Sequence, residues 1–299
     1  MIGFNLPAST VTVEPDRTSS FTSAKSKAWK YTFCFWKSIE SIPSFRIPVP
    51  KTERGKSLFS ATTIRSILPN QNPFFCKSLK EYFADIDTAL ATIRSEGNER
   101  ILLMAHSTGG LITPYYLNSK KGELPIDGLI LNSPFLDWNF GWFMEKVVLP
   151  TVAFVGRLFP NLTVQGLGDP NYAYSLLKQY KGEWEFDTNW KMIFGHPKKA
   201  GWIKAIQEAQ QAVQKGLKLD CPILVMSSNK SFPETETWHE EYMTSDIVLD
   251  VQDIQKYGEK LGDKVTRDTI PNGIHDLILS QKPYRNDAYQ TIFEWLKKQ

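Results

Sequence analysis

The residue whose type and neighbours most clearly suggest a chemical role is Ser107, which lies in the segment AHSTGG (residues 105–110). The segment is G-x-S-x-G with alanine at the first position, a residue small enough to let a strand and a helix approach. At a tight strand-to-helix turn the serine hydroxyl projects above a sheet, and the N–H of Thr108 points toward an oxyanion formed during acyl transfer. The alternative is a Gly-rich turn needed only for packing.

A serine nucleophile needs a base, and His275 is the candidate. A neutral hydroxyl is a poor nucleophile, whereas an imidazole takes its proton near neutral pH and returns it to a leaving group. His275 lies in the segment PNGIHD (271–276) after a predicted strand; a solvated loop histidine is the alternative. His106 adjoins the serine and is expected to pack or donate a hydrogen bond behind it, while His196 and His239 lie in irregular stretches.

The elements that must position these residues alternate between buried strands and helices from Cys76 onward. Apolar residues at helical spacing predict a helix ending near 96–97: Leu79, Tyr82, Phe83, Ile86, Leu90 and Ile93. Short apolar runs predict strands within 100–105, 125–134, 221–227 and 264–270, and a helix follows Ser107 over 111–117. A last helix is predicted to begin near 286–287, with Tyr289, Ile292, Phe293 and Leu296 on one face. Continuous apolar strands separated by helices are typical of a mostly parallel, doubly wound α/β sheet.

The alternation stops between residues 135 and 217, where helix formers and five tryptophans occur. Because ligands of open α/β sheets bind at the carboxyl ends of the strands, we expect this segment to be an inserted helical cap over a pocket. Its aromatic side chains either contact substrate or form a small core of their own. Residues 71–134 and 218–299 then form the sheet core, and residues 1–70 form an atypical segment, disordered or not native to the fold.

The elbow segment, followed by Leu111-Ile112-Thr113, resembles that of α/β-hydrolases, specifically the monoglyceride-lipase and lysophospholipase-like group with serine-aminopeptidase-type domains. The resemblance extends from about Arg65 to the C-terminus. It implies the chain order serine, acid, histidine, with the histidine in the loop after the last strand, as at His275.

The same resemblance places the acid a few residues past the strand that ends near Met226, but the segment 227–230 contains no carboxylate. An insertion therefore intervenes before DIVLD (246–250), which resembles the D-x-V-x-D form of the group. Asp246 is the favoured acid that orients the imidazole, Asp250 is the second choice, and helix capping is the alternative for either.

The oxyanion of such hydrolases is held by two backbone donors, and losing one costs roughly 100- to 1,000-fold in turnover. Thr108 can supply the first. The resemblance places the second in a His-Gly loop after an early strand, but residues 1–105 contain no His-Gly. Either the N-terminal segment supplies another donor, or it is not a native hydrolase N-terminus, for example because of a reading-frame error.

Composition indicates an ordinary globular protein, and no metal or cofactor is expected. The chain has 299 residues, 41% of them hydrophobic, and its three cysteines are far apart, so no disulfide framework or metal motif is predicted. No signal peptide or membrane span is evident, which predicts a cytoplasmic location and no stable membrane insertion.

The net charge of +3 is unevenly distributed: residues 1–70 carry ten Lys and Arg against four Asp and Glu, or +6, and the remainder carries 25 against 28, or −3. Residues 1–70 lack a coherent basic helix or aromatic platform, so no nucleic-acid partner is expected. The leading functional prediction is hydrolysis of a small, lipophilic acyl ester through a Ser107 acyl-enzyme. The alternatives are an aminopeptidase-like amide hydrolase and a catalytically impaired binding protein; the sequence leaves the oligomeric state open.

Overall fold

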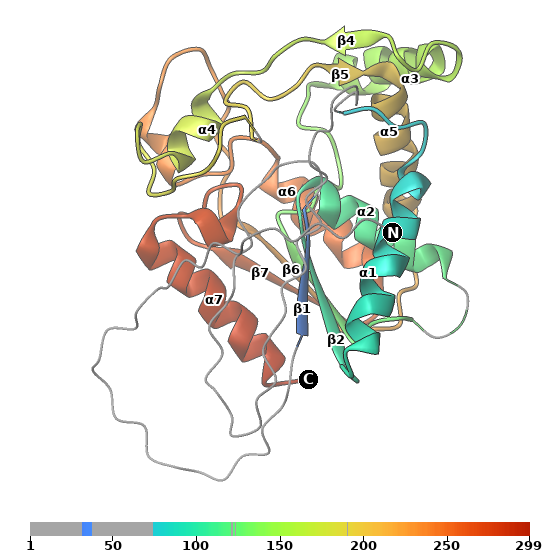
Figure 1. Cartoon of the computed structure of the whole chain (residues 1–299). Coiled ribbons are helices and arrows are strands. Elements are labelled where there is room, and N and C mark those ends of the chain that lie inside the picture. Colours follow the sequence, from blue (N-terminus) through green and yellow to red (C-terminus); the bar gives the residue numbers. More distant parts are fainter. Residues whose placement is uncertain (1–31, 38–73, 121, 123, 190) are drawn as a thin grey trace.

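The computed structural model describes residues 32–37, 74–120, 122, 124–189 and 191–299. Five parallel strands form the central sheet in the order β1-β2-β3-β6-β7 (Figure 1). The strands are β1 (Thr32–Lys37), β2 (Ile101–His106), β3 (Gly128–Asn132), β6 (Ile223–Ser228) and β7 (Val265–Ile270). The predicted parallel α/β sheet is thus confirmed.

Side chains alternate cleanly between the two faces of the three central strands. One face joins a core with α1, α2, α5 and α6, and the other face packs against α7. On β2, for example, Leu103 and Ala105 belong to the first core, while Leu102 and Met104 belong to the second. Because both faces are covered, the strands read as unbroken apolar runs, which is why the sequence revealed them.

The helices follow the predicted order along the chain. They are α1 (Phe83–Ser95), α2 (Thr108–Ser119), α3 (Leu149–Leu158), α4 (Asn171–Leu176), α5 (Ala200–Gln214), α6 (Val251–Gly258) and α7 (Lys282–Leu296). Short turns of 3-10 helix are η1 (Leu79–Tyr82), η3 (Glu240–Met243), η4 (Glu259–Leu261) and η5 (Leu277–Leu279), and η2 (Met144–Val148) is a π-helical turn. The predicted helix before β2 corresponds to η1 and α1 together.

The predicted start of the last helix was wrong by about one turn. Helix α7 begins at Lys282, with Pro283 in its first turn. Proline fits there because its fixed φ suits the helix and its missing N–H would have no intrahelical partner. The buried face is also shifted: Trp295 is buried, whereas Phe293 is partly exposed.

Between β3 and β6 the chain leaves the sheet and forms α3, α4 and α5 together with an antiparallel pair, β4 (Thr163–Gln165) and β5 (Lys198–Lys199). The sequence did not predict this pair. In Figure 1, α3, α4, β4 and β5 lie above the sheet.

Two tryptophans of this segment join the main core rather than a small core of the segment, and a contact with substrate stays a prediction. Trp138 and Trp202 are buried in the main core, where their ring centroids lie 6.1 Å apart. Trp184 donates its indole N–H to the carbonyl of Leu279, which ties this segment to the chain after β7. Trp142 is instead 71% exposed. For most of these rings, packing is the observed role.

The prediction for residues 1–70 falls mostly outside the described residues. Within it, β1 pairs in parallel with β2 over its whole length, from Thr32 opposite Ile101 to Lys37 opposite His106. Across the part of the chain that the structure describes, no helix is both long enough and apolar enough to span a bilayer.

The approach of α2 to the end of β3 depends on Gly110. A Cβ atom built there would lie 2.7 Å from Cβ of Pro134, closer than carbon atoms approach. We expect Gly110→Ala to lower the free energy of unfolding by about 1–3 kcal/mol, because this overpacking outweighs the gain in helix propensity of about 1 kcal/mol. Urea denaturation measures the change.

Gly166→Ala is the matched control, since nothing lies within 4 Å of its added Cβ. A Gly110→Ala protein as stable as this control would contradict the predicted clash.

Candidate active site

Ser107 occupies a sharp turn between β2 and α2. Its φ of 52° is positive, which is unfavourable for a residue with a side chain, and strain of this kind persists only where surrounding contacts enforce it. Here the Ser107 N–H donates to the carbonyl of Asn132 (3.1 Å), and the Phe135 N–H donates to the carbonyl of Ser107 (2.9 Å). The chain after β3 therefore holds the turn on both sides.

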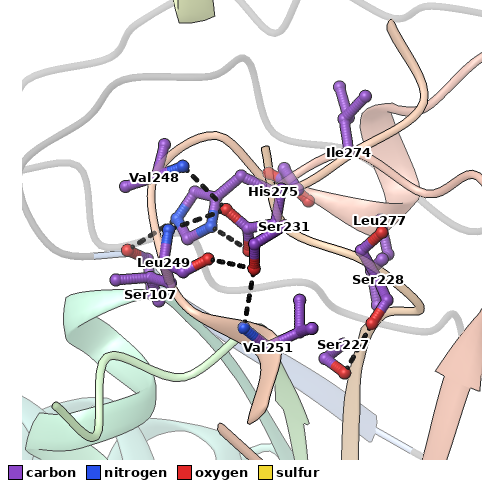
Figure 2. A network of polar contacts seen from close by, with 12 residues as sticks. Ser107, Ser227, Ser228, Ser231, Val248, Leu249, Val251, Ile274, His275 and Leu277 are labelled. Carbon is purple, nitrogen blue, oxygen red and sulfur yellow. Dashed lines mark hydrogen bonds and ion pairs between the residues drawn. The ribbon is translucent and has the colours of Figure 1, made fainter. Parts of the chain in front are cut away.

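The structure brings Ser107, His275 and Asp246 together in one hydrogen-bonded chain. Figure 2 labels Ser107 and His275 of this chain. Oγ of Ser107 lies 2.9 Å from Nε2 of His275, and Nδ1 of His275 lies 2.9 Å from Oδ2 of Asp246. A carboxylate only accepts, so Nδ1 carries the proton and Nε2 is left to accept from the serine hydroxyl. His275 is 2% exposed and Asp246 is fully buried, so water competes little with these contacts.

The two candidate acids have different surroundings. Asp246 also accepts from the N–H groups of Val248 and Leu249, each at 2.9 Å, which fixes its second oxygen. Asp250 instead caps α6 and accepts from the N–H of Gln252 at 2.8 Å. Of the two aspartates, Asp246 is therefore the one that forms a hydrogen bond with the imidazole, whereas Asp250 has the helix-capping role.

The expected insertion before the acid is present as a closed loop. The N–H of Asp246 donates to the carbonyl of Lys230, and the N–H of Phe232 donates to the carbonyl of Asp246, both at 3.0 Å. The residues between Lys230 and Asp246 thus form a loop whose two ends are hydrogen-bonded to each other. Asp246 returns to the end of β6, where an acid without the insertion would stand.

Ser231 is a site residue that sequence reasoning missed. Its hydroxyl donates to the carbonyl of Leu249 and accepts from the N–H of Val251, each at 2.9 Å (Figure 2). These bonds close the turn that carries Asp246. No sequence signal could have found this role, because the partners are about twenty residues away.

Tyr172 of α4 was also missed. Its ring meets that of His275 edge to face, with centroids 5.6 Å apart. Of the other two histidines named from the sequence, His196 lies beside Phe74, and His239 packs against Phe232.

Of the two expected oxyanion donors, Thr108 is the first residue of α2, where a backbone N–H has no intrahelical partner. The early strand is β1, whose last residue lies opposite His106. Parallel strands end at the same edge of a sheet, so Lys37 ends β1 at the edge where Ser107 follows β2. The residues that follow β1 lie outside the described ranges, and the second donor stays a prediction.

Among described residues no cluster of three or more His, Cys, Asp or Glu side chains is arranged to hold a metal ion.

A parallel sheet with a serine elbow after β2 and a histidine after its last strand, β7, is the arrangement typical of an α/β-hydrolase. A family model described as "Serine aminopeptidase, S33" matches residues 70–232, more than half of the chain. The chain therefore belongs to this family of α/β-hydrolases. The match includes the elbow and ends before Asp246 and His275. A search of curated proteins finds no similar sequence.

Solved structures share the fold at low sequence identity. The crystal structure of Paleococcus ferrophilus monoacylglycerol lipase superposes with a TM-score of 0.51 and 18% identity, covering 73% of this chain and 75% of that chain. A structure from a study of LipS and LipT, two metagenome-derived lipolytic enzymes, reaches a TM-score of 0.54 with 12% identity, covering 90% of this chain and 94% of that chain. These two structures therefore support the fold assignment.

Glu234, in the inserted loop, has an unusual environment. Burial, together with the nearby charge of Asp169, raises the pKa of its carboxyl to about 7, although hydrogen bonds from Asn171 and Tyr172 oppose the change. In the unfolded chain this carboxyl has its ordinary pKa of 4.5. At pH values between these two pKa values, the carboxyl of Glu234 is protonated in the folded protein and ionised in the unfolded chain.

The sign of the pH dependence follows from this difference. The contribution of Glu234 to stability is fully present below about pH 4.5 and is lost as the pH rises through about 7. We expect Glu234→Gln to become increasingly stable relative to wild type from about pH 5 to about pH 8. Urea midpoints across this range measure it. Glu241→Gln, at an exposed carboxyl of the same loop, is the control; an equal trend in both variants would contradict the assignment.

Proposed function

We propose that the protein hydrolyses carboxylic esters, with Ser107 as nucleophile, His275 as general base and acid, and Asp246 as the group that orients the imidazole. The observation that carries this proposal is the unbroken chain of two 2.9 Å hydrogen bonds through His275. A hydrogen-bonded base turns a hydroxyl into a nucleophile at neutral pH, and a buried carboxylate holds the base in the correct tautomer.

In the first half of the reaction, Oγ of Ser107 forms a bond to the ester carbonyl carbon while its proton passes to Nε2 of His275. The carbonyl electron pair moves to oxygen, and the Thr108 N–H donates to the resulting oxyanion. When the pair returns, the bond to the alcohol oxygen breaks, and His275 gives its proton to that oxygen. The products of this half are a free alcohol and an acyl group on Ser107.

In the second half, water replaces the alcohol. His275 removes a proton from water as the water oxygen attacks the acyl carbon. The bond between the acyl carbon and Oγ of Ser107 then breaks, and the same imidazole returns the proton to Oγ. The carboxylic acid leaves, and the enzyme regains its starting state. No step requires a metal or organic cofactor.

A lipophilic acyl group is the proposed substrate class. The apolar ring of Tyr172 lies against His275, and Trp142 and Phe143 present exposed aromatic surface on the segment between β3 and β6. An apolar substrate gains free energy by burying its chain against such surfaces. The similar folds also include proteins described as a monoacylglycerol lipase and as lipolytic enzymes.

Labelling with a fluorophosphonate probe tests the nucleophile directly. We expect covalent labelling of the wild-type protein at Ser107, shown by mass spectrometry of the labelled peptide, and none in Ser107→Ala, because only an activated serine attacks the probe. Absence of labelling in the pure wild-type protein would favour the impaired binding protein. Comparing p-nitrophenyl butyrate with aminoacyl p-nitroanilides then separates esterase from aminopeptidase activity.

The two aspartates of the DIVLD segment provide a matched test of the acid. We expect Asp246→Asn to lower kcat by about 10⁴-fold, because an amide cannot hold the imidazole in the productive tautomer. Asp250→Asn should leave kcat close to wild type, since asparagine caps a helix about as well as aspartate. Equal losses in both variants, measured by ester hydrolysis, would rule out the proposed division of roles.

A further inference from the structure

Three buried polar residues behind His275 have no part in the proposed reaction. His106 is the last residue of β2, Asn132 is the last residue of β3, and Asp276 directly follows His275. Asn132 is 0% exposed and Asp276 is 1% exposed. Burying an amide and a carboxylate is costly unless their hydrogen bonds are satisfied, so their contacts call for an explanation.

The side chain of Asn132 forms hydrogen bonds with the two residues that follow His275, Asp276 and Leu277. Its Nδ2 donates to Oδ1 of Asp276 at 2.7 Å, and its Oδ1 accepts from the N–H of Leu277 at 3.2 Å. The amide thus uses its donor and its acceptor on two consecutive residues. Such a two-point contact fixes the direction of the loop as well as its distance from the sheet.

The backbone carbonyl of Asn132 forms hydrogen bonds with His106 and Ser107, at the turn between β2 and α2. It accepts from the N–H of Ser107 at 3.1 Å and from Nδ1 of His106 at 2.9 Å. Asn132 is therefore bonded on one side to the residue that carries the hydroxyl and on the other to the loop that carries the base.

His106 completes this arrangement. Nε2 of His106 lies 3.8 Å from Oδ2 of Asp276, and its ring centroid lies 4.7 Å from that of His275. The carboxylate of Asp276 is thus approached by an amide and an imidazole, and the imidazole also packs against the catalytic ring. Tyr289 of α7 is a further titratable group near Asp276: burial and the charge of Asp276 raise the pKa of its hydroxyl, and the charge of Arg285 opposes this change.

We propose that Asn132 is a positioning residue for the serine–histidine pair, setting the separation of Ser107 Oγ and His275 Nε2 through the hydrogen bond between its amide and Asp276. This inference rests on the proposed function, because it assigns a role within that reaction. An error of about 1 Å between reacting groups can cost on the order of 100-fold in rate, so the contact need not touch substrate to matter.

A positioning role has a distinct kinetic signature. Asn132 is fully buried and lies behind the histidine, so its loss should lower kcat and leave KM nearly unchanged. The isosteric variant Asn132→Asp sharpens the test. Its carboxylate still accepts from Leu277 but faces Asp276 without a donor, and two adjacent carboxyl groups can share a proton that they lose as the pH rises.

The experiment compares wild type, Asn132→Asp, Asn132→Ala and the control Tyr116→Phe, with p-nitrophenyl butyrate as substrate from about pH 5.5 to about pH 8.5. The hydroxyl of Tyr116, in α2, donates to Asp87, in α1, at 2.6 Å. The control therefore also removes a hydrogen bond of a buried side chain. We expect both Asn132 variants to lose about 10- to 100-fold in kcat at pH 8 with similar KM. For Asn132→Asp, the ratio of its kcat to that of wild type should rise toward acidic pH.

A second measurement does not depend on turnover. Proton NMR in water reads the downfield resonance of the His275 Nδ1–H bonded to Asp246, identified by its loss in Asp246→Asn. We expect this resonance to shift or broaden in Asn132→Ala and to stay unchanged in Tyr116→Phe. If Asn132→Ala does not fold, Asp276→Ala removes the same contact from the loop side and carries the same expectation.

The outcomes separate this inference from the proposed function. A wild-type protein that labels at Ser107 and turns over ester, with unchanged kcat and an unchanged resonance in the Asn132 variants, would overturn the positioning role alone. Losses equal to those of Tyr116→Phe at every pH would also overturn it. If the wild type neither labels nor turns over, the proposed function fails, and the resonance still decides whether Asn132 positions His275.

Discussion

The positive φ of Ser107 is the constraint on which the rest of the site depends. This backbone state costs free energy, so it persists only because neighbouring contacts enforce it. The hydrogen bonds from Ser107 and Phe135 hold the turn against the end of β3, and the absence of a Cβ at Gly110 lets α2 approach Pro134. The strained turn, the small residues around it and the strand beside it therefore form one unit, and the serine hydroxyl takes its direction from that unit.

The order of strands in the sheet brings the remaining groups to this hydroxyl. Strands β2, β3, β6 and β7 are parallel, so their carboxyl ends meet at one edge, where ligands of α/β sheets bind. Ser107 follows β2, Asp246 returns to the end of β6, and His275 follows β7. Residues separated by 168 positions in the chain thus come within hydrogen-bonding distance. Asn132, at the end of β3, bonds to both the serine turn and the histidine loop.

Local patterns explain where prediction from the sequence worked. Both faces of the central strands are buried, so each strand appears as a short apolar run, and a small-residue turn after such a run reveals the elbow. Prediction was weaker where long-range contacts decide the structure. The pairing of β4 with β5 joins segments that are polar and short, whereas the start of α7 was misplaced although Pro283, a local signal, marks its first turn. Ser231 and Tyr172 acquire their roles from partners distant in sequence.

The sequence by itself determined the fold class, the elbow around Ser107 and the loop that carries His275, because these depend on local patterns of apolar, small and turn-forming residues. It left Asp246 and Asp250 as alternatives, since both follow the same insertion and both are carboxylates. Only the tertiary structure separated them: the loop closure at Lys230 turns Asp246 toward the imidazole, while Asp250 caps α6. The buried contact of Asn132 with Asp276 was likewise decided by tertiary structure, because a hydrogen bond across 144 residues leaves no trace in local sequence.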